Sequence, residues 1–190
     1  GTTTNHEIRF LTNNTEKFQI AADGSLSTPT AGTSNVRFGV NAGNSITSGG
    51  NYNTVIGDEA GTAITTGDNN VAVGYGALDA EDTGIGSVAI GYNALTAQNN
   101  DAINYNVAVG TNAGAAVTTG TQNSLIGYGA GLALTDADFN TVLGTNALAT
   151  DTLGSKSTAI GTQALATQNF TSATDSFNTA IGYQTGLNLT

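Results

Sequence analysis

The phrase Ser87-Val88-Ala89-Ile90-Gly91 decides the fold of this chain, because eight further copies of it recur along the sequence. Each copy reads Asn or Ser, a β-branched or small residue, a second apolar or variable residue, a large apolar residue and Gly. Subtracting the numbers of neighbouring Gly residues gives steps of 17, 18, 19 and 21. Such a period predicts a solenoid, in which each coil buries its apolar face only by stacking on the next coil. The nine Gly residues are Gly39, Gly57, Gly74, Gly91, Gly110, Gly127, Gly144, Gly161 and Gly182.

Each phrase is expected to form a short strand with two apolar faces. The residue before Gly is always large and apolar, whereas the residue one position earlier points to the opposite face and is mostly small. One face must line the interior of the coil. We expect the small-residue face to pack against identical strands of other chains in a homotrimer. Its residues are Val55, Ala72, Ala89, Ala108, Leu125, Val142, Ala159 and Ala180, with Arg37 as the exception in the first copy.

The repeats form a longer pattern of four coils. In two coils the next core residue lies seven positions after Gly, in the following two it lies four positions after Gly, and the order then repeats. Ser replaces the leading Asn at Ser87 and Ser157, the fourth and eighth copies. We therefore predict an all-β, parallel β-solenoid or β-roll of about nine 17–18-residue coils at 35–190. It comprises two four-coil units at 35–105 and 106–177 and a partial ninth coil. The core residues after Gly are Ile46, Ile64, Val117, Leu134 and Leu189 in one kind of coil, and Leu78, Leu95, Leu148 and Leu165 in the other.

Residues 1–34 form a separate N-terminal module with a linker. Two alternating segments, 7–11 and 17–20, are separated by the turn cluster Thr12-Asn13-Asn14-Thr15, which predicts a β-hairpin. Asp23-Gly24 predicts a second turn, and Pro29 lies in a linker before the repeats.

Composition argues against several classes of partner. The formal charge is −10 at pH 7, and the cations are Arg9, Lys17, Arg37 and Lys156. Nucleic acids would be repelled, because their binding requires Lys and Arg to neutralise phosphates. No apolar run is long enough to cross a bilayer. We expect no cofactor and no membrane insertion in this segment.

Four copies, at residues 70–74, 87–91, 106–110 and 157–161, resemble the head repeat of trimeric autotransporter adhesins. That resemblance implies a parallel β-roll in which three chains pack together, although the adhesin repeats are shorter. Residues 178–184, and residues 11–20 followed by Asp23-Gly24, are similar to bacteriophage tail fibre proteins. This second resemblance implies a trimeric virion fibre that attaches to a bacterial host.

Little in the sequence supports catalysis or metal binding. His6 is the sole histidine and lies outside the repeats, so neither a Ser-His-Asp relay nor a His-ligated metal is expected. Hexapeptide acyltransferases also form coils, but their six-residue aliphatic spacing and catalytic His do not occur here. Carboxylates gather at Asp58-Glu59, Glu81-Asp82 and Asp136/Asp138, but the nonapeptide of calcium rolls is missing, so we interpret them as solvated turns. We expect no catalytic, cofactor-binding or metal-binding residues.

Aromatic residues are the candidates for receptor binding. Tyr follows Gly in four coils, and the connections 96–105 and 166–177 are lengthened, as loops on the binding face of solenoids often are. These aromatics could stack on a glycan, shield turns or anchor the loops. The candidates are Tyr92, Tyr105, Tyr128, Phe170 and Phe177.

The sequence thus predicts a non-enzymatic, homotrimeric segment of a phage tail fibre on the virion surface, with a bacterial surface glycan or protein as a possible receptor. One alternative is the head of a bacterial surface adhesin, which would place the chain on the cell surface or outside the cell. A second is an ice-binding solenoid, since Thr is abundant, although the pairs Thr65-Thr66 and Thr118-Thr119 recur in only two coils. A further alternative is a polysaccharide-cleaving tailspike, whose paired catalytic carboxylates would have to meet across coils or chains.

Overall fold

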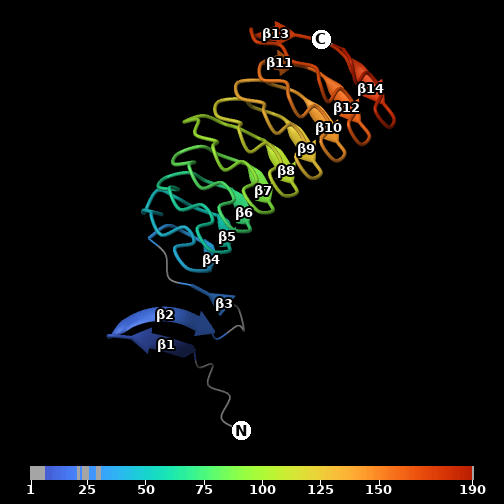
Figure 1. Ribbon diagram of the computed structural model, residues 1–190. Coiled ribbons are helices and arrows are strands. Elements are labelled where there is room, and N and C mark those ends of the chain that lie inside the picture. Colours follow the sequence, from blue (N-terminus) through green and yellow to red (C-terminus); the bar gives the residue numbers. More distant parts are fainter. Residues whose placement is uncertain (1–6, 21, 23–25, 29–30, 190) are drawn as a thin grey trace.

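The computed structural model describes residues 7–20, 22, 26–28 and 31–189, and within these ranges the chain is all-β without a helix. Figure 1 shows a stack of coils that advances along one axis, with a small hairpin module beside the first coil. His6, the turn predicted at Asp23-Gly24 and Pro29 of the predicted linker lie outside the described residues.

The nine copies of the phrase form one parallel sheet along the stack. Its strand order is β14-β12-β10-β9-β8-β7-β6-β5-β4, so that each strand pairs with its counterpart in the neighbouring coil. This confirms the predicted parallel β-solenoid of about nine coils. The strands are β4 (Val36–Phe38), β5 (Thr54–Ile56), β6 (Val71–Val73), β7 (Val88–Ile90), β8 (Val107–Val109), β9 (Ser124–Ile126), β10 (Thr141–Leu143), β12 (Thr158–Ile160) and β14 (Thr179–Ile181). A second, two-stranded parallel sheet joins β11 (Gly154–Ser155) to β13 (Thr174–Asp175).

The Gly that ends each phrase is required by both its backbone and its neighbour. Gly74, for example, has φ of +127°, and a Cβ placed on it would lie 2.6 Å from the carbonyl oxygen of Gly91 in the next coil. An L side chain is disfavoured at this φ and would also collide with the next turn of backbone. The positive φ applies to all nine closing Gly residues, and the collision with the next turn of backbone applies to the first eight, since Gly182 lies in the last coil.

The small-residue face lines the interior of the coil, contrary to the sequence-based expectation. Val55, Ala72, Ala89, Ala108, Leu125, Val142, Ala159 and Ala180 are between 0% and 2% exposed within a single chain. Their assignment to packing between chains is therefore wrong. The coil interior is narrow, since a Cβ placed on Gly61, in the turn after β5, would lie 3.0 Å from Val55 Cγ1. Small side chains fit this space, and the large residue before Gly is left on the outer face.

The other core positions follow the predicted spacing. Ile46, Ile64, Val117 and Leu134, seven residues after Gly, are buried, as are Leu78, Leu95, Leu148 and Leu165, four residues after Gly. Leu189 in the last coil is the exception, because it remains 48% exposed. An additional buried column, not predicted from the sequence, lies three residues after Gly. It consists of Ala42, Ala60, Ala77, Ala94, Ala113, Ala130, Ala147 and Ala164.

The leading Asn residues form a buried hydrogen-bonded ladder. The Oδ1 atom of Asn123 accepts hydrogen bonds from the backbone N and Nδ2 of Asn140, at 2.9 and 3.1 Å. Asn123 Nδ2 in turn donates to the carbonyl oxygen of Ala137, near the end of the same coil, at 2.7 Å. Each Asn thus satisfies polar groups that the coil buries where the strand begins.

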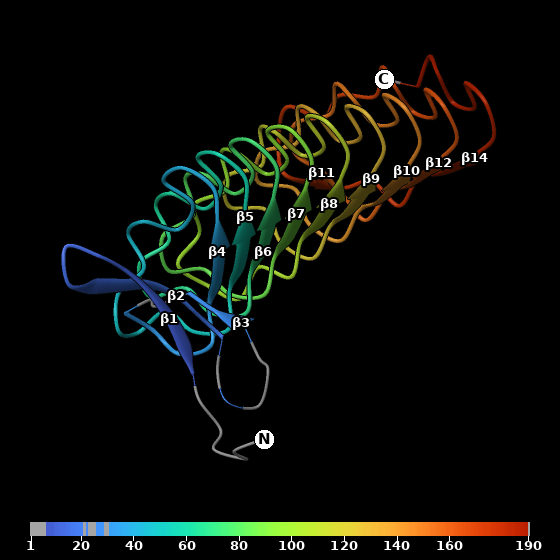
Figure 2. The same ribbon diagram turned by 90° about the horizontal axis from the view of Figure 1, so that it is seen from below.

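The N-terminal module is a three-stranded antiparallel sheet of β1 (Ile8–Thr12), β2 (Thr15–Ile20) and β3 (Leu26–Ser27). Asn13 and Asn14, with φ of 50° and 57°, form the turn between β1 and β2, which confirms the predicted hairpin. Figure 2 shows this module at the same end of the stack as β4.

Candidate interaction surface

The outer face of the nine-stranded sheet carries two residues from each strand. The residue before Gly forms an apolar column in which Ile56, Ile90 and Ile126 are 38–39% exposed and Phe38 is 48% exposed. The residue two positions earlier forms a parallel column of Val, Thr and Ser. At about 4.8 Å between paired strands, nine strands extend over roughly 40 Å. We call the surface formed by these two columns the sheet face.

The sheet face has no charged residue, although the chain carries a formal charge of −10. The one charged residue of the nine strands is Arg37, which occupies the inward-facing middle position of β4. Contiguous exposed apolar patches are typical of interaction sites on soluble proteins, and the residues before Gly form such a row along the sheet. Depletion of charge is also typical of the centre of protein–protein interfaces.

Exposed aromatic residues flank the sheet face at both ends of the strands. Tyr75, Tyr92, Tyr128 and Tyr183 follow Gly and are 50–70% exposed. Two of these Tyr residues in adjacent coils, Tyr75 and Tyr92, stack on each other with their ring centroids 5.5 Å apart. Before the Asn column, a second set is 48–69% exposed and has φ between 50° and 60°. It consists of Tyr52, Tyr105, Phe139 and Phe177.

The five predicted receptor-binding residues differ in their freedom to meet a ligand. Tyr92 and Tyr128 are half-exposed, but Tyr92 is already stacked on Tyr75. Phe170 is partly buried and lies against Gly154, where a Cβ would come within 2.7 Å of its Cδ2.

Tyr105 and Phe177 are more exposed but also have contacts within the chain. The Tyr105 ring lies against Gly86, where a Cβ would come within 2.7 Å of its Cδ1. The Phe177 ring has Lys156 Nζ 5.4 Å from its centroid. Both residues therefore help to hold down their loops while leaving part of the ring accessible.

A buried carboxylate anchors each lengthened connection. Glu81 is fully buried, and its Oε2 accepts hydrogen bonds from Gln98 Nε2 and Asn104 Nδ2, both at 2.8 Å. Its Oε1 accepts one from the backbone N of Gly84 at 2.7 Å. Burial raises the pKa of Glu81, while these hydrogen bonds oppose the rise. The interpretation of Glu81 as part of a solvated turn is therefore wrong.

The same arrangement recurs 70 residues later. Asp151 accepts hydrogen bonds from Gln168 Nε2 at 2.6 Å and from the backbone N of Phe170 at 2.9 Å. In both places the Gln also reaches the Ser that replaces Asn in the buried ladder, and its Oε1 accepts from the following Asn. These bonds join Gln98 to Ser87 and Asn106, and Gln168 to Ser157 and Asn178. The lengthened loops are thus built around a Gln that takes the place of the missing Asn side chain.

Among the residues that the structure describes, no group of three His, Cys, Asp or Glu side chains is placed to hold a metal ion. In the same part of the chain, no helix is long and apolar enough to span a membrane. Comparisons with family models, curated proteins and solved structures give no match to this chain.

Proposed function

We propose that this chain is a non-enzymatic segment of a homotrimeric virion fibre, and that the sheet face is the surface through which its copies associate. The observation that carries this proposal is the exposed, charge-free apolar face of the parallel sheet on a strongly acidic chain.

Burial of the sheet face offers a substantial driving force. Complete burial of an aliphatic side chain contributes about 1.5–3 kcal/mol. The nine apolar residues before Gly, eight aliphatic residues and Phe38, are already partly covered, so we assign about 1 kcal/mol to each, or roughly 9 kcal/mol per chain. That is comparable with the cost of association, estimated at about 4–15 kcal/mol. The Val residues of the second column add to this contribution.

The geometry favours a parallel arrangement of copies. Every coil presents the same two outward positions at a constant spacing, so chains aligned along their long axes match coil for coil. Cyclic symmetry about a common axis closes such an assembly without leaving one sheet face uncovered. The number of three copies comes from the resemblance of the repeats to trimeric adhesin heads.

Attachment to a host is the second part of the proposal. The aromatic residues that stay accessible outside the sheet face, above all Tyr105 and Phe177, provide ring surface for contact with a bacterial glycan or protein. A bacterial surface adhesin remains the alternative on the same fold. The sequence on either side of this segment discriminates the two, because a membrane anchor favours the adhesin and a fibre chaperone domain favours the virion.

The interface is tested by a matched pair of substitutions in one coil. Ile126 on the sheet face is 39% exposed, and Leu132, on the turn after Gly131, is 38% exposed. Ile126→Glu would place a carboxylate in the interface and should shift the chain to monomer in sedimentation equilibrium. Leu132→Glu adds the same charge off the sheet and should leave the trimer intact. Equal sedimentation of the two variants, with native circular dichroism, would contradict the proposal.

Ice binding is a second candidate because the sheet face is regular and charge-free and includes Thr54, Thr141, Thr158 and Thr179. By contrast, the hydroxyls of Thr65 and Thr118 donate to carbonyl oxygens of the next coil and belong to the stack itself. Thermal hysteresis of the wild type that disappears in Ile126→Glu would favour ice binding over association.

A further inference from the structure

A cavity of about 430 Å³ lies between the hairpin module and the first coil. Thr15, Glu16 and Lys17 of β2 line one side, and Arg37, Gly39 and Ala42 line the other. Two of the four Lys and Arg residues of this acidic chain therefore meet at one cavity. Neither Lys17 nor Arg37 forms an ion pair with a residue in the described ranges.

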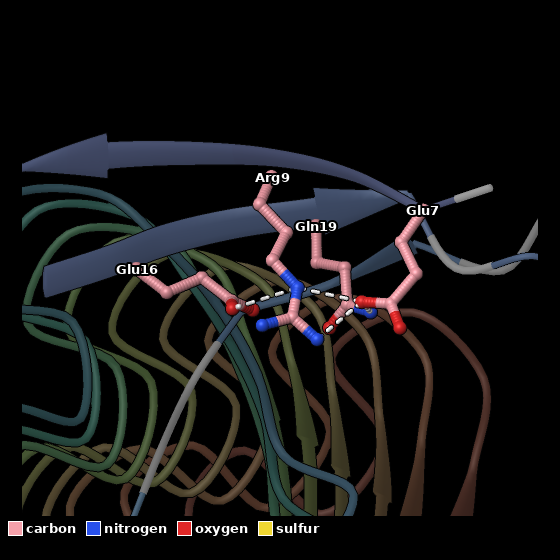
Figure 3. A network of polar contacts seen from close by, with 4 residues as sticks. All are labelled: Glu7, Arg9, Glu16 and Gln19. Atoms are coloured by element: carbon pink, nitrogen blue, oxygen red, sulfur yellow. Dashed lines mark hydrogen bonds and ion pairs between the residues drawn. The ribbon is translucent and has the colours of Figure 1, made fainter.

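The carboxylate of Glu16 is already engaged with a cation of the hairpin. Arg9 Nε lies 3.5 Å from Glu16 Oε2 and donates to Glu7 Oε2 at 2.6 Å. Gln19 Nε2 also donates to Glu7 Oε2, at 2.8 Å. Figure 3 shows these four side chains converging on one side of the hairpin. Arg9 is shared between Glu7 and Glu16 and so offsets the charge of Glu16 only in part, but Lys17 and Arg37 outnumber this one carboxylate in the lining and give the cavity a net positive character.

Arg37 is held so that part of its guanidinium group remains available. Its Nε donates to the carbonyl oxygen of Ala42 at 2.6 Å, and its backbone N donates to Thr28 Oγ1 at 3.2 Å. The two Nη groups have no hydrogen-bond partner in the described part of the chain. Partial burial lowers the pKa of Arg37, because the charged form loses water without gaining a carboxylate. An anion in the cavity would supply the missing partner.

The residues that line the cavity favour a sugar acid as its ligand over an inorganic anion. Guanidinium groups bind carboxylates through two parallel N–H···O bonds, and Lys17 adds a second positive charge. The hydroxyls of Thr15 and Thr28 and the carboxylate of Glu16 can pair with sugar hydroxyls. A volume of about 430 Å³ falls in the range of small-molecule sites. We propose that this cavity binds a monosaccharide carboxylate of the uronic acid class.

Isothermal titration calorimetry with D-glucuronate tests this proposal. D-Glucose serves as a control that has the sugar ring without the carboxylate, and sulfate as a control that has negative charge without the sugar. The wild type should bind glucuronate saturably, glucose undetectably and sulfate at least about tenfold more weakly than glucuronate. Arg37→Gln and Lys17→Gln should each weaken glucuronate binding about tenfold or more. Lys156→Gln makes the same charge change at the end of the distant seventh coil and should leave binding unchanged.

Several results would overturn the proposal. They are absence of saturable glucuronate binding to the wild type, sulfate binding as tight as that of glucuronate, and equal binding by Lys17→Gln and Lys156→Gln. Lys17 is exposed on β2, so Lys17→Gln should fold normally and decides the outcome even if Arg37→Gln does not fold. Loss of the oligomer in Arg37→Gln would instead assign the cavity to contacts between copies. The site needs only one chain, so its test is independent of the trimer.

Discussion

The substitution Asn123→Ala tests how much the buried Asn ladder contributes to stability. Asn123 is a suitable position because it makes the full set of hydrogen bonds of the ladder. The substitution removes the acceptor of the Asn140 backbone N–H and the donor to the Ala137 carbonyl, which are joined to Asn123 at 2.9 and 2.7 Å. Asn140 Nδ2 loses one bond but retains the carbonyl of Gly154, at 3.0 Å. Two buried backbone groups are therefore left without partners. At about 1–3 kcal/mol for each group, the free energy of unfolding should fall by about 2–6 kcal/mol.

The assay is equilibrium urea unfolding followed by circular dichroism, at one protein concentration because association contributes to stability. Asn178→Ala is the matched control, since Asn178 lies in the last coil and is only partly buried. Its side chain donates to Gln168 Oε1 at 2.7 Å, so its loss leaves one buried acceptor without a partner and should cost about 1–3 kcal/mol, half the effect of Asn123→Ala. If Asn123→Ala loses no more stability than Asn178→Ala, the buried Asn ladder does not stabilise the stack.

Two further predictions concern the closing Gly and the buried carboxylate. Gly74→Ala should prevent stacking at that coil and lower the thermal midpoint much more than Gly182→Ala, because Gly182 shares the positive φ but a Cβ there meets only the side chain of Thr185. Burial raises the pKa of Glu81, so the folded state holds its proton to higher pH than the unfolded chain does. The contribution of Glu81 to the free energy of unfolding should therefore be greatest below the pKa of Glu81 in the unfolded chain. It should fall as the pH rises through the raised pKa of the folded state. Unfolding of the wild type against Glu81→Gln, measured from pH 4 to 8, should show this decline, whereas a pH-independent difference would argue against it.

Much of the fold could be predicted because each coil repeats the same pattern of backbone conformation and buried residues. Gly at a positive φ, a buried Asn where the strand begins and one large core residue four or seven positions after Gly recur at a fixed spacing, so nine weak signals reinforce one another. The hairpin was predictable from alternation and from two consecutive Asn residues in its turn.

The inner face of the strand could not be predicted, because both faces are apolar. Alternation separates Ala89 from Ile90 but does not say which of them points inward. The answer depends on the width of the closed coil, which leaves room inside for small side chains such as Ala89. That width is a property of the closed coil and is absent from the local pattern.

The buried clusters were missed for a related reason. Glu81 and Gln98 are polar residues of the kind found in solvent-exposed turns. Nothing in the neighbouring sequence distinguishes them from Asp82 or Asn99. The sequence feature that could have revealed the cluster is Ser87. Its side chain is shorter than that of the Asn found in most other copies, which leaves a buried space that a longer polar residue must fill. The recurrence of Ser and Gln at 157 and 168 could have indicated the pairing.

Sedimentation equilibrium of the unmodified chain at micromolar concentration tests the central claim most directly. Association through the sheet face predicts a mass of about 57 kDa, three times the 18.9 kDa of one chain. A mass of 18.9 kDa, unchanged on raising the concentration, would show that the sheet face faces water and would contradict the account.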